Sequence, residues 1–238
     1  QTMSTLSPLQ SAPLKSGVPL LVNGERMKQP EFHRRYLQYP EDDKWELIGG
    51  VVYHMASPLK LTHSNYDDEI GYLLGTYRRA TPGVQVTHNA TAILDEDSEP
   101  QPDLGMRILP EYGGQSQTSH DDYLQGAPEL LVEIAHSRRN VAMHAKRADY
   151  ERTGIIEYLV VCVEEQEVHW FHFPSGQLVT PNRQGISRSR VFPGLWIEPN
   201  ALLRCDSPRL AEVLQQGLAS REHAAFVKRL QAAHRKHS

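Results

Sequence analysis

The chain has 238 residues, of which 39% are hydrophobic and 23% are charged. This length suits one globular domain with appendages, and no run of residues approaches the roughly 20 apolar positions that a membrane-spanning helix needs. The 25 basic and 29 acidic residues give a formal net charge of −4. That balance excludes the simplest kind of nucleic-acid-binding protein, a strongly basic chain, but it allows a local basic groove.

Two further features bear on the cellular location. The start of the chain has neither the basic nor the apolar segment of a secretory signal peptide. Cys162 and Cys205 are the only cysteines, which excludes a disulfide framework and favours a reducing compartment. We therefore expect a cytoplasmic protein without a membrane partner.

The first segments predict an arm followed by a short helix. Residues 1–19 are rich in Ser, Thr, Pro and Gln and indicate a flexible arm. Residues 29–42 predict a short helix that opens at a Pro-Glu pair, with Phe32, Tyr36 and Leu37 on one side.

A hairpin and a longer helix are expected next. Residues 45–56 predict two short strands joined by the glycine pair at 49–50. Residues 63–83 have the apolar spacing of an amphipathic helix that Ser64 or Asn65 can cap and that a Pro-Gly pair ends.

The middle of the chain predicts strands around a loop. Residues 84–95 alternate like a strand, and so does the segment around Asp103, whereas residues 109–125 are polar and predict a loop. Residues 127–135 predict a mostly buried strand, and residues 138–153 predict a helix that ends before a glycine.

The last third predicts a strand pair and two helices. The strands are expected at 155–163 and 167–173, and the helices at 208–218 and 220–236. Strands and helices alternate without a regular βαβ period, so the fold class is α/β or α+β with a mixed central sheet.

One acidic residue lies inside an apolar run. In residues 130–135, LLVEIA, Leu131 and Glu133 share one strand face, and every residue on the other face is apolar. Charged side chains are rarely buried unless they are paired or bind a metal ion. Glu133 therefore either points to solvent from an edge strand or faces a cleft that holds a metal ion or a second charge.

Two other acidic residues are candidates for the same site. Asp103 follows Pro102 at the start of a strand or at a bend, although a Pro-Asp pair alone is more often a turn than a site. Glu46 lies between two apolar residues near a strand start, where a surface position is the simpler interpretation. Asp103 and Glu133 on adjacent strands can share a divalent cation such as Mg²⁺, which takes oxygen ligands.

The helix after the Glu133 strand carries a candidate cation. Lys146 and Tyr150 are four residues apart and share a helix face. Lys146 is either a solvated helix lysine or, if the helix folds back, a partner of the strand carboxylate. His63 opens a helix, where an imidazole can cap N–H groups or contact a phosphate. The sequence has no phosphate-binding loop, dinucleotide-binding glycine motif, HExxH zinc motif or GxSxG serine motif.

The order of these motifs resembles one known family. The segments WELIGGVVYHMASP, HSNYDDEIGYLLGTY, PQPDL, GAPELLVEIAHS and GIIEYLVV, with a Lys and a Tyr between the last two, resemble the Uma-two family of restriction endonucleases. That family is a bacterial branch of the PD-(D/E)XK nuclease superfamily. The resemblance covers residues 20–200 as a core domain. Residues 201–238 resemble the helical C-terminal extension of longer members.

The resemblance implies a restriction-endonuclease-like core, with a mixed sheet flanked by helices. It also implies an endonuclease that hydrolyses DNA phosphodiester bonds with Mg²⁺, which Mn²⁺ can replace, and a homodimer that matches the two strands of a duplex. By that similarity the metal ligands would be Asp103, Glu133 and the backbone carbonyl of Ile134, and Glu46 would match the early acid of the family.

The resemblance also explains a missing cation. The superfamily lysine usually follows the second acid by two residues, where this chain has Ala135. In other Uma-two sequences the lysine has moved to the next helix, and Lys146 fits that position, with Tyr150 as support. The chain departs from the family pattern at Ala142, where an acid is common, and after ELI, where Gly49-Gly50 replaces the usual pair of an acid and a glycine.

We therefore expect a metal-dependent endonuclease in which Lys146 orients a water or offsets charge on the phosphate. Two alternatives stay open: a catalytically weak DNA-binding or regulatory module with the same fold, and a metal-dependent hydrolase of another phosphoester. The expected contacts to the DNA backbone are arginines at helix ends, namely Arg78, Arg79, Arg138 and Arg139.

Overall fold

The computed structural model describes residues 17–40, 42–55, 61–137 and 141–237. Its centre is a six-stranded mixed sheet of order β11–β10–β9–β8–β5–β3, in which β8 and β9 are parallel and the other neighbours are antiparallel. The strands are β3 (Val84–His88), β5 (Leu104–Ile108), β8 (Leu130–Ala135), β9 (Glu157–Cys162), β10 (Glu167–His172) and β11 (Gln177–Leu178). The sequence predicts this mixed sheet, and the prediction is confirmed.

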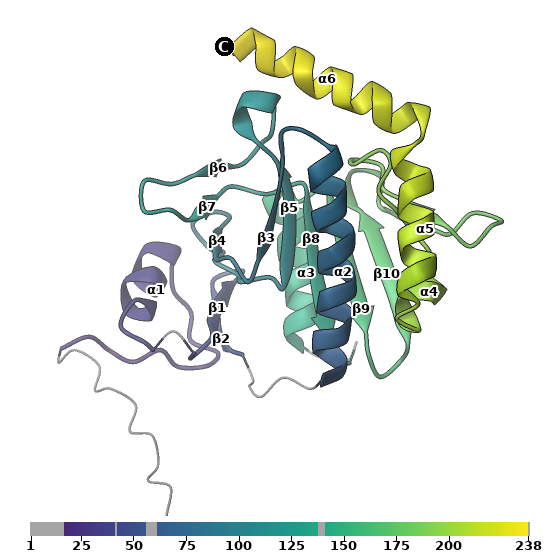
Figure 1. Ribbon diagram of the computed structural model, residues 1–238. Coiled ribbons are helices and arrows are strands. Elements are labelled where there is room, and N and C mark those ends of the chain that lie inside the picture. Colours follow the sequence, from purple (N-terminus) through teal and green to yellow (C-terminus); the bar gives the residue numbers. More distant parts are fainter. Residues whose placement is uncertain (1–16, 41, 56–60, 138–140, 238) are drawn as a thin grey trace, which may run out of the picture.

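Helices cover both faces of the sheet (Figure 1). The helix α2 (Leu61–Ala80) packs on the face that includes Leu130, Val132 and Ile134, and α3 (Val141–Thr153) packs on the opposite face. Because side chains alternate along a strand, Glu133 lies on the α3 face. The apolar pattern of β8 thus decides which helix its one acid meets.

The C-terminal helices pack into the main core. They are α4 (Pro199–Leu203), α5 (Ser207–Leu218) and α6 (Arg221–His237). Leu202, Leu214 and Phe226 are at most 2% exposed and belong to the same apolar cluster as the α2 face of the sheet. None of the helices in the described part of the chain is long and apolar enough to span a membrane.

Small elements complete the fold beside the sheet. The helix α1 (Gln29–Tyr36) lies against the hairpin of β1 (Trp45–Ile48) and β2 (Val51–His54). Gly49 and Gly50 both have positive φ, as the predicted two-residue hairpin turn requires. The remaining short elements are β4 (Ala92–Ile93), β6 (Gln117–Thr118), β7 (Leu124–Gln125), β12 (Ser187–Arg188), β13 (Trp196–Ile197) and the 3₁₀ turns Pro110–Tyr112 and Phe173–Ser175.

Several local expectations are wrong. The helix α2 already includes Leu61, so Ser64 and Asn65 lie inside it and do not cap it. Leu37 is 59% exposed, because five residues along a helix turn it away from the face that holds Phe32. The predicted strand at 84–95 is divided at Asn89, whose positive φ ends the ladder.

Most of the predicted arm, residues 1–16, lies outside the described residues. The expected helix at 138–153 is described only from Val141.

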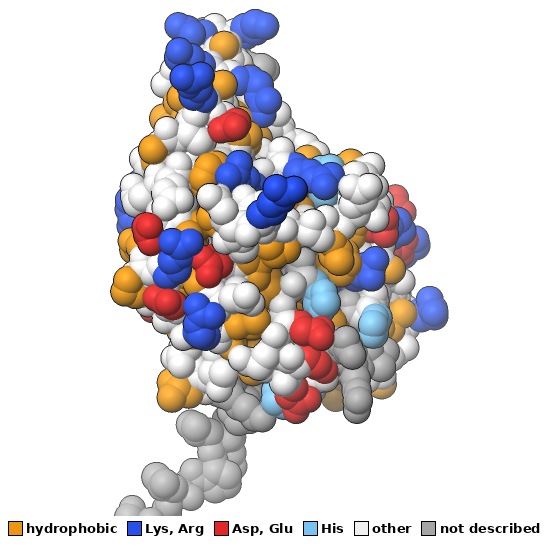
Figure 2. Space-filling model, turned by 90° about the vertical axis from the view of Figure 1, so that its right-hand side faces the viewer, with side chains coloured by type: hydrophobic (Ala, Val, Ile, Leu, Met, Phe, Trp, Pro, Cys, Tyr) orange, Lys and Arg blue, Asp and Glu red, His pale blue; other side chains and the backbone are white. Residues whose placement is uncertain are grey.

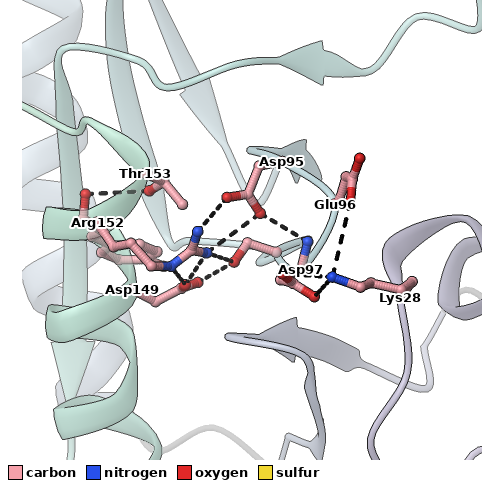
Figure 3. A network of polar contacts seen from close by, with 9 residues as sticks. Lys28, Asp95, Glu96, Asp97, Asp149, Arg152 and Thr153 are labelled. Atoms are coloured by element: carbon pink, nitrogen blue, oxygen red, sulfur yellow. Dashed lines mark hydrogen bonds and ion pairs between the residues drawn. The ribbon is translucent and has the colours of Figure 1, made fainter.

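A polar network fixes α3 to the connection before β5 (Figure 3). Arg152 donates hydrogen bonds to Asp149 one turn earlier at 2.6 Å and to Asp95 at 2.5 Å. On the far side of the same connection, Lys28 forms an ion pair with Asp97 at 2.9 Å. The network holds the helix at a defined height above the sheet, and with it the residues that the helix presents to β8.

A second buried contact makes stability depend on pH. The Glu99 side chain is 1% exposed and lies 2.7 Å from Nδ1 of His33, and this hydrogen bond raises the pKa of His33 above 6.5 although burial opposes it. Because the pKa is raised, the contact makes its full contribution to the stability of the fold below pH 6.5. This contribution is lost as the pH rises through the folded-state pKa of His33.

We expect His33→Gln to lower the free energy of unfolding by about 1.5–3 kcal/mol at about pH 5.5 and by much less at about pH 8.5. Urea denaturation at the two pH values measures the difference. His54→Gln is the matched control, because its ion pair with Asp43 is half-exposed and contributes less than about 1 kcal/mol. A His33→Gln effect that is independent of pH would contradict this account.

Candidate active site

The strand register brings two of the candidate acids together. Leu104 pairs with Val132, so Asp103 and Glu133 stand opposite one another at the end of the β5–β8 ladder. Each is 8% exposed. Both side chains lie on the face that α3 covers, as the alternation along each strand requires.

A proline explains why the ladder ends there. The next antiparallel pair would join Pro102 to Ile134, but Pro102 has no N–H to donate to the Ile134 carbonyl. The N–H of Ile134 donates to Oδ2 of Asp103 at 2.8 Å instead. Because the N–H and C=O of one strand residue point to the same side, the Ile134 carbonyl also faces the Asp103 side.

Lys146 joins two of the acids beneath α3. Its Nζ lies 2.7 Å from Oε1 of Glu133 and 2.8 Å from Oε2 of Glu46. Lys146 is 4% exposed and Glu46 is fully buried. Four residues further along the helix, the Tyr150 hydroxyl donates to the same Glu133 oxygen at 2.9 Å. The lysine thus points at the strand carboxylates and not at bulk solvent.

The N-terminal turn of α2 supplies a histidine to the site. Nε2 of His63 lies 3.4 Å from Oδ2 of Asp103. Burial raises the pKa of Asp103, but His63 and the Ile134 N–H outweigh it and hold that pKa below its usual value. The hydrogen bond to Asp103 in turn raises the pKa of His63. Asp103 is therefore ionised at neutral pH.

The pKa of Glu133 shifts in the opposite direction to that of Asp103. Burial is the largest influence and, with the charges of Asp103 and Glu46, raises its pKa to about 7 although Lys146 opposes the shift. The pKa of Lys146 is itself raised, because the attraction of Glu133 and Glu46 outweighs its burial. Three buried carboxylates thus lie around one buried lysine, with His63 at Asp103 and the partly exposed Lys44 at 4.0 Å from Glu46.

The donor set suits a hard divalent cation. The hydrogen bonds that Asp103 and Glu133 receive from the described residues fall on Oδ2 of Asp103 and Oε1 of Glu133, and the Ile134 carbonyl lacks its ladder donor. No three His, Cys, Asp or Glu side chains in the described part of the chain form a metal-holding group. Two carboxylates and one carbonyl, with the other positions left to water, match the preference of Mg²⁺.

Two contacts and one acidic residue were missed by sequence reasoning. The backbone N–H of Gln101 donates to Oε1 of Glu46 at 2.9 Å, and this contact ties β1 to the Asp103 segment. Asp67 lies on the same face of α2 as His63, and burial raises its pKa. The buried Tyr158 ring packs edge-on against Tyr150 at 5.2 Å. Only the spacing of four residues between His63 and Asp67 offered a signal in the sequence.

The candidate DNA-binding arginines are placed differently. Arg78 and Arg79 end α2, about 22 Å along the helix axis from His63. Arg138 and Arg139 lie outside the described residues. Lys and Arg side chains gather at the top of the molecule (Figure 2), where α6 lies, at the opposite end of α2 from the acids (Figure 1). On the face that Figure 2 shows, the densest group of basic side chains thus lies at the α6 end of the molecule, away from the start of α2.

Comparisons with known proteins agree with this fold. The model of the Uma2 family, described as "Putative restriction endonuclease", matches residues 30–201. A crystal structure of a putative nuclease belonging to DUF820 from Anabaena variabilis is similar with a TM-score of 0.56 at 15% sequence identity. That similarity covers 72% of this chain and 97% of the other. No curated protein matches the sequence.

The buried lysine gives a direct prediction about stability. We expect Lys146→Met to lower the free energy of unfolding by about 3–5 kcal/mol at about pH 8.5, because it leaves buried carboxylates without their cation. The loss is smaller at about pH 5.5. At that pH, which is below its raised pKa, Glu133 of the folded variant is protonated and carries no charge that needs a cation, and only the cost of keeping this proton remains.

Urea denaturation at both pH values measures this loss. Lys28→Met is the control, because the Lys28 side chain is 63% exposed and solvent screens its ion pair with Asp97. Equal, small effects of the two substitutions at both pH values would show that Lys146 does not compensate the acids.

Proposed function

Because this chain belongs to the Uma2 family, we propose that it is a metal-dependent endodeoxyribonuclease that hydrolyses phosphodiester bonds of DNA. The observation that carries the proposal is the group of three oxygens at the end of the β5–β8 ladder. Asp103 and Glu133 stand opposite one another there, the Ile134 N–H donates to Asp103, and the buried Lys146 lies at Glu133; we propose that Oδ1 of Asp103, Oε2 of Glu133 and the Ile134 carbonyl are the ligands. We propose Mg²⁺ as the ion that they bind, with Mn²⁺ as a substitute.

A bound Mg²⁺ would polarise the scissile phosphate and lower the pKa of a coordinated water. The protein side chains prepare the ligands for that ion. Tyr150 and Lys146 both donate to Oε1 of Glu133 and so leave its Oε2 available. The Ile134 N–H and His63 lie at Oδ2 of Asp103 and leave its Oδ1 available. Each carboxylate is therefore oriented before a ligand arrives.

Lys146 has a second role in the proposal. Its ammonium has three N–H donors, which Glu46 and Glu133 hold at the site. A phosphate that enters the site competes with Glu46 for one of these donors and gains a charge-assisted hydrogen bond. Lys146 thereby offsets negative charge that develops on the phosphate in the transition state.

We propose a cytoplasmic homodimer as the working form, since two copies related by a two-fold axis match the two strands of a duplex. The basic helix α6 and the α2 terminus at Arg78 and Arg79 are the surfaces proposed to contact the DNA backbone. A net charge of −4 favours contact through such local surfaces over general attraction to DNA.

One observation favours a second candidate function. The amine of Lys146 already lies within 2.8 Å of both Glu46 and Glu133, so the acids have a cation without any metal. A chain that keeps this closed arrangement in the presence of Mg²⁺ would be a DNA-binding or regulatory module with the nuclease fold.

A cleavage assay separates the two candidates. We expect wild-type protein to cut plasmid DNA in Mg²⁺ or Mn²⁺, and Asp103→Asn and Glu133→Gln each to lower the rate at least about 100-fold because each removes a metal ligand. Calorimetric titration with Mn²⁺ follows the loss of metal binding directly. Glu151→Gln, an exposed acid next to Tyr150 on α3, is the control that keeps full activity.

Cutting that persists in both ligand variants would refute the assignment of Asp103 and Glu133. Binding of DNA by the wild type without any cutting, in either metal, would favour the second candidate.

A further inference from the structure

A groove of about 370 Å³ lies beside α3, on the same face of the sheet as the candidate active site. This volume falls within the range of small-molecule sites, roughly 300–1,000 Å³. Its lining comes from α3, β9, β10 and β11 and includes the aromatic, cationic or imidazole side chains of His144, Arg147, Tyr158, His169 and Phe171. None of the residues that line it is acidic.

The strand register places the groove next to the acids. Val160, on its floor, pairs with Glu133 on β8 and with His169 on β10. Neighbouring strands are about 4.7–4.9 Å apart, so the floor begins one strand away from Glu133. Tyr158 and Phe171, which also pair with one another, form the next row of the same floor.

The chemistry of the lining suits a nucleotide. The guanidinium of Arg147 lies 4.2 Å from the centre of the Phe171 ring, and no carboxylate of the described residues forms an ion pair with it. An arginine without an acidic partner next to an aromatic face provides both a phosphate contact and a stacking surface. Arg147 follows Lys146 directly in α3. The same helical turn therefore directs Lys146 to the acids and Arg147 to the groove.

A buried hydroxyl marks the inner end of the groove. Tyr158 is 1% exposed, and none of the described residues hydrogen-bonds its hydroxyl. Burial, followed by the charge of Glu133, raises its pKa far above the usual value, so the hydroxyl keeps its proton. Buried polar groups normally have a partner, and this hydroxyl is a donor on one of the residues that line the groove.

We propose that the groove binds one unpaired nucleotide of the DNA strand, next to the phosphate that is cleaved. Arg147 swings from Phe171 to the phosphate of that nucleotide, and the base takes its place on the Phe171 ring. In a duplex the bases are stacked on each other and their faces are covered, so only an unpaired or flipped base can enter. This inference rests on the proposed function, and it restricts the substrate to DNA with a single-stranded segment.

Fluorescence titration without metal tests the proposal on the full chain. The probe is an oligonucleotide that contains 2-aminopurine, offered single-stranded or in a fully paired duplex. We expect the wild type to bind the single strand more tightly and to quench its fluorescence by stacking. Phe171→Leu, which keeps an apolar side chain but removes the aromatic face, is expected to weaken single-strand binding about 5- to 150-fold.

Arg147→Gln should weaken single-strand binding as well and leave duplex binding unchanged. Its matched control is Arg188→Gln, because Arg188 makes the same kind of stack on Trp196 at 3.8 Å and does not line the groove. Arg147 is an exposed residue, so we expect its variant to fold, and a thermal melt of each variant verifies this.

Equal losses for single strand and duplex, or no loss in either groove variant, would overturn the proposal. Its failure is distinguishable from that of the proposed function. If the wild type cleaves DNA with metal but Phe171→Leu and Arg147→Gln bind the single strand as the wild type does, only the proposal about the groove is refuted. If both variants lose single-strand binding but the wild type does not cleave DNA, the groove proposal is supported and the proposed nuclease function is refuted.

Discussion

The ion pairs of one buried lysine hold the candidate site together. Lys146 reaches from α3 to Glu133 on β8 and to Glu46 on β1, and it is the nearest cation to both. Lys146 favours the ionised form of Glu133, whose pKa burial and the charges of Asp103 and Glu46 raise to about 7. The position of α3 depends on these ion pairs, and the hairpin that carries Glu46 is held against the sheet by the same contacts.

The apolar patterns predicted the sheet, its flanking helices and the face on which Glu133 lies, because each depends on alternation along a single strand or helix. They did not predict the partners of the acids. The N–H of Gln101 reaches Glu46 across more than fifty residues, and the start of α2 before Ser64 depends on packing and not on a cap. Such contacts arise from tertiary structure, which overrides local preference.

The helix α3 connects the candidate site to the groove. Its successive residues Lys146 and Arg147 point to opposite sides of Tyr158, one to the acids and one to the aromatic floor. Arg152 fixes the C-terminal half of the helix to the segment before β5, the strand that Asp103 precedes. A phosphate at the acids and a base in the groove would therefore be held by one rigid body, as the positioning of a strand for cleavage requires.

The most direct test of this account is a crystal structure of the full chain with Mn²⁺, read from the anomalous signal of the metal. The account predicts one strong peak within coordination distance of Oδ1 of Asp103, Oε2 of Glu133 and the Ile134 carbonyl, with Lys146 still bound to Glu46. A peak at other residues, or no peak while Lys146 bridges Glu46 and Glu133, would contradict the assignment of these oxygens as a metal site.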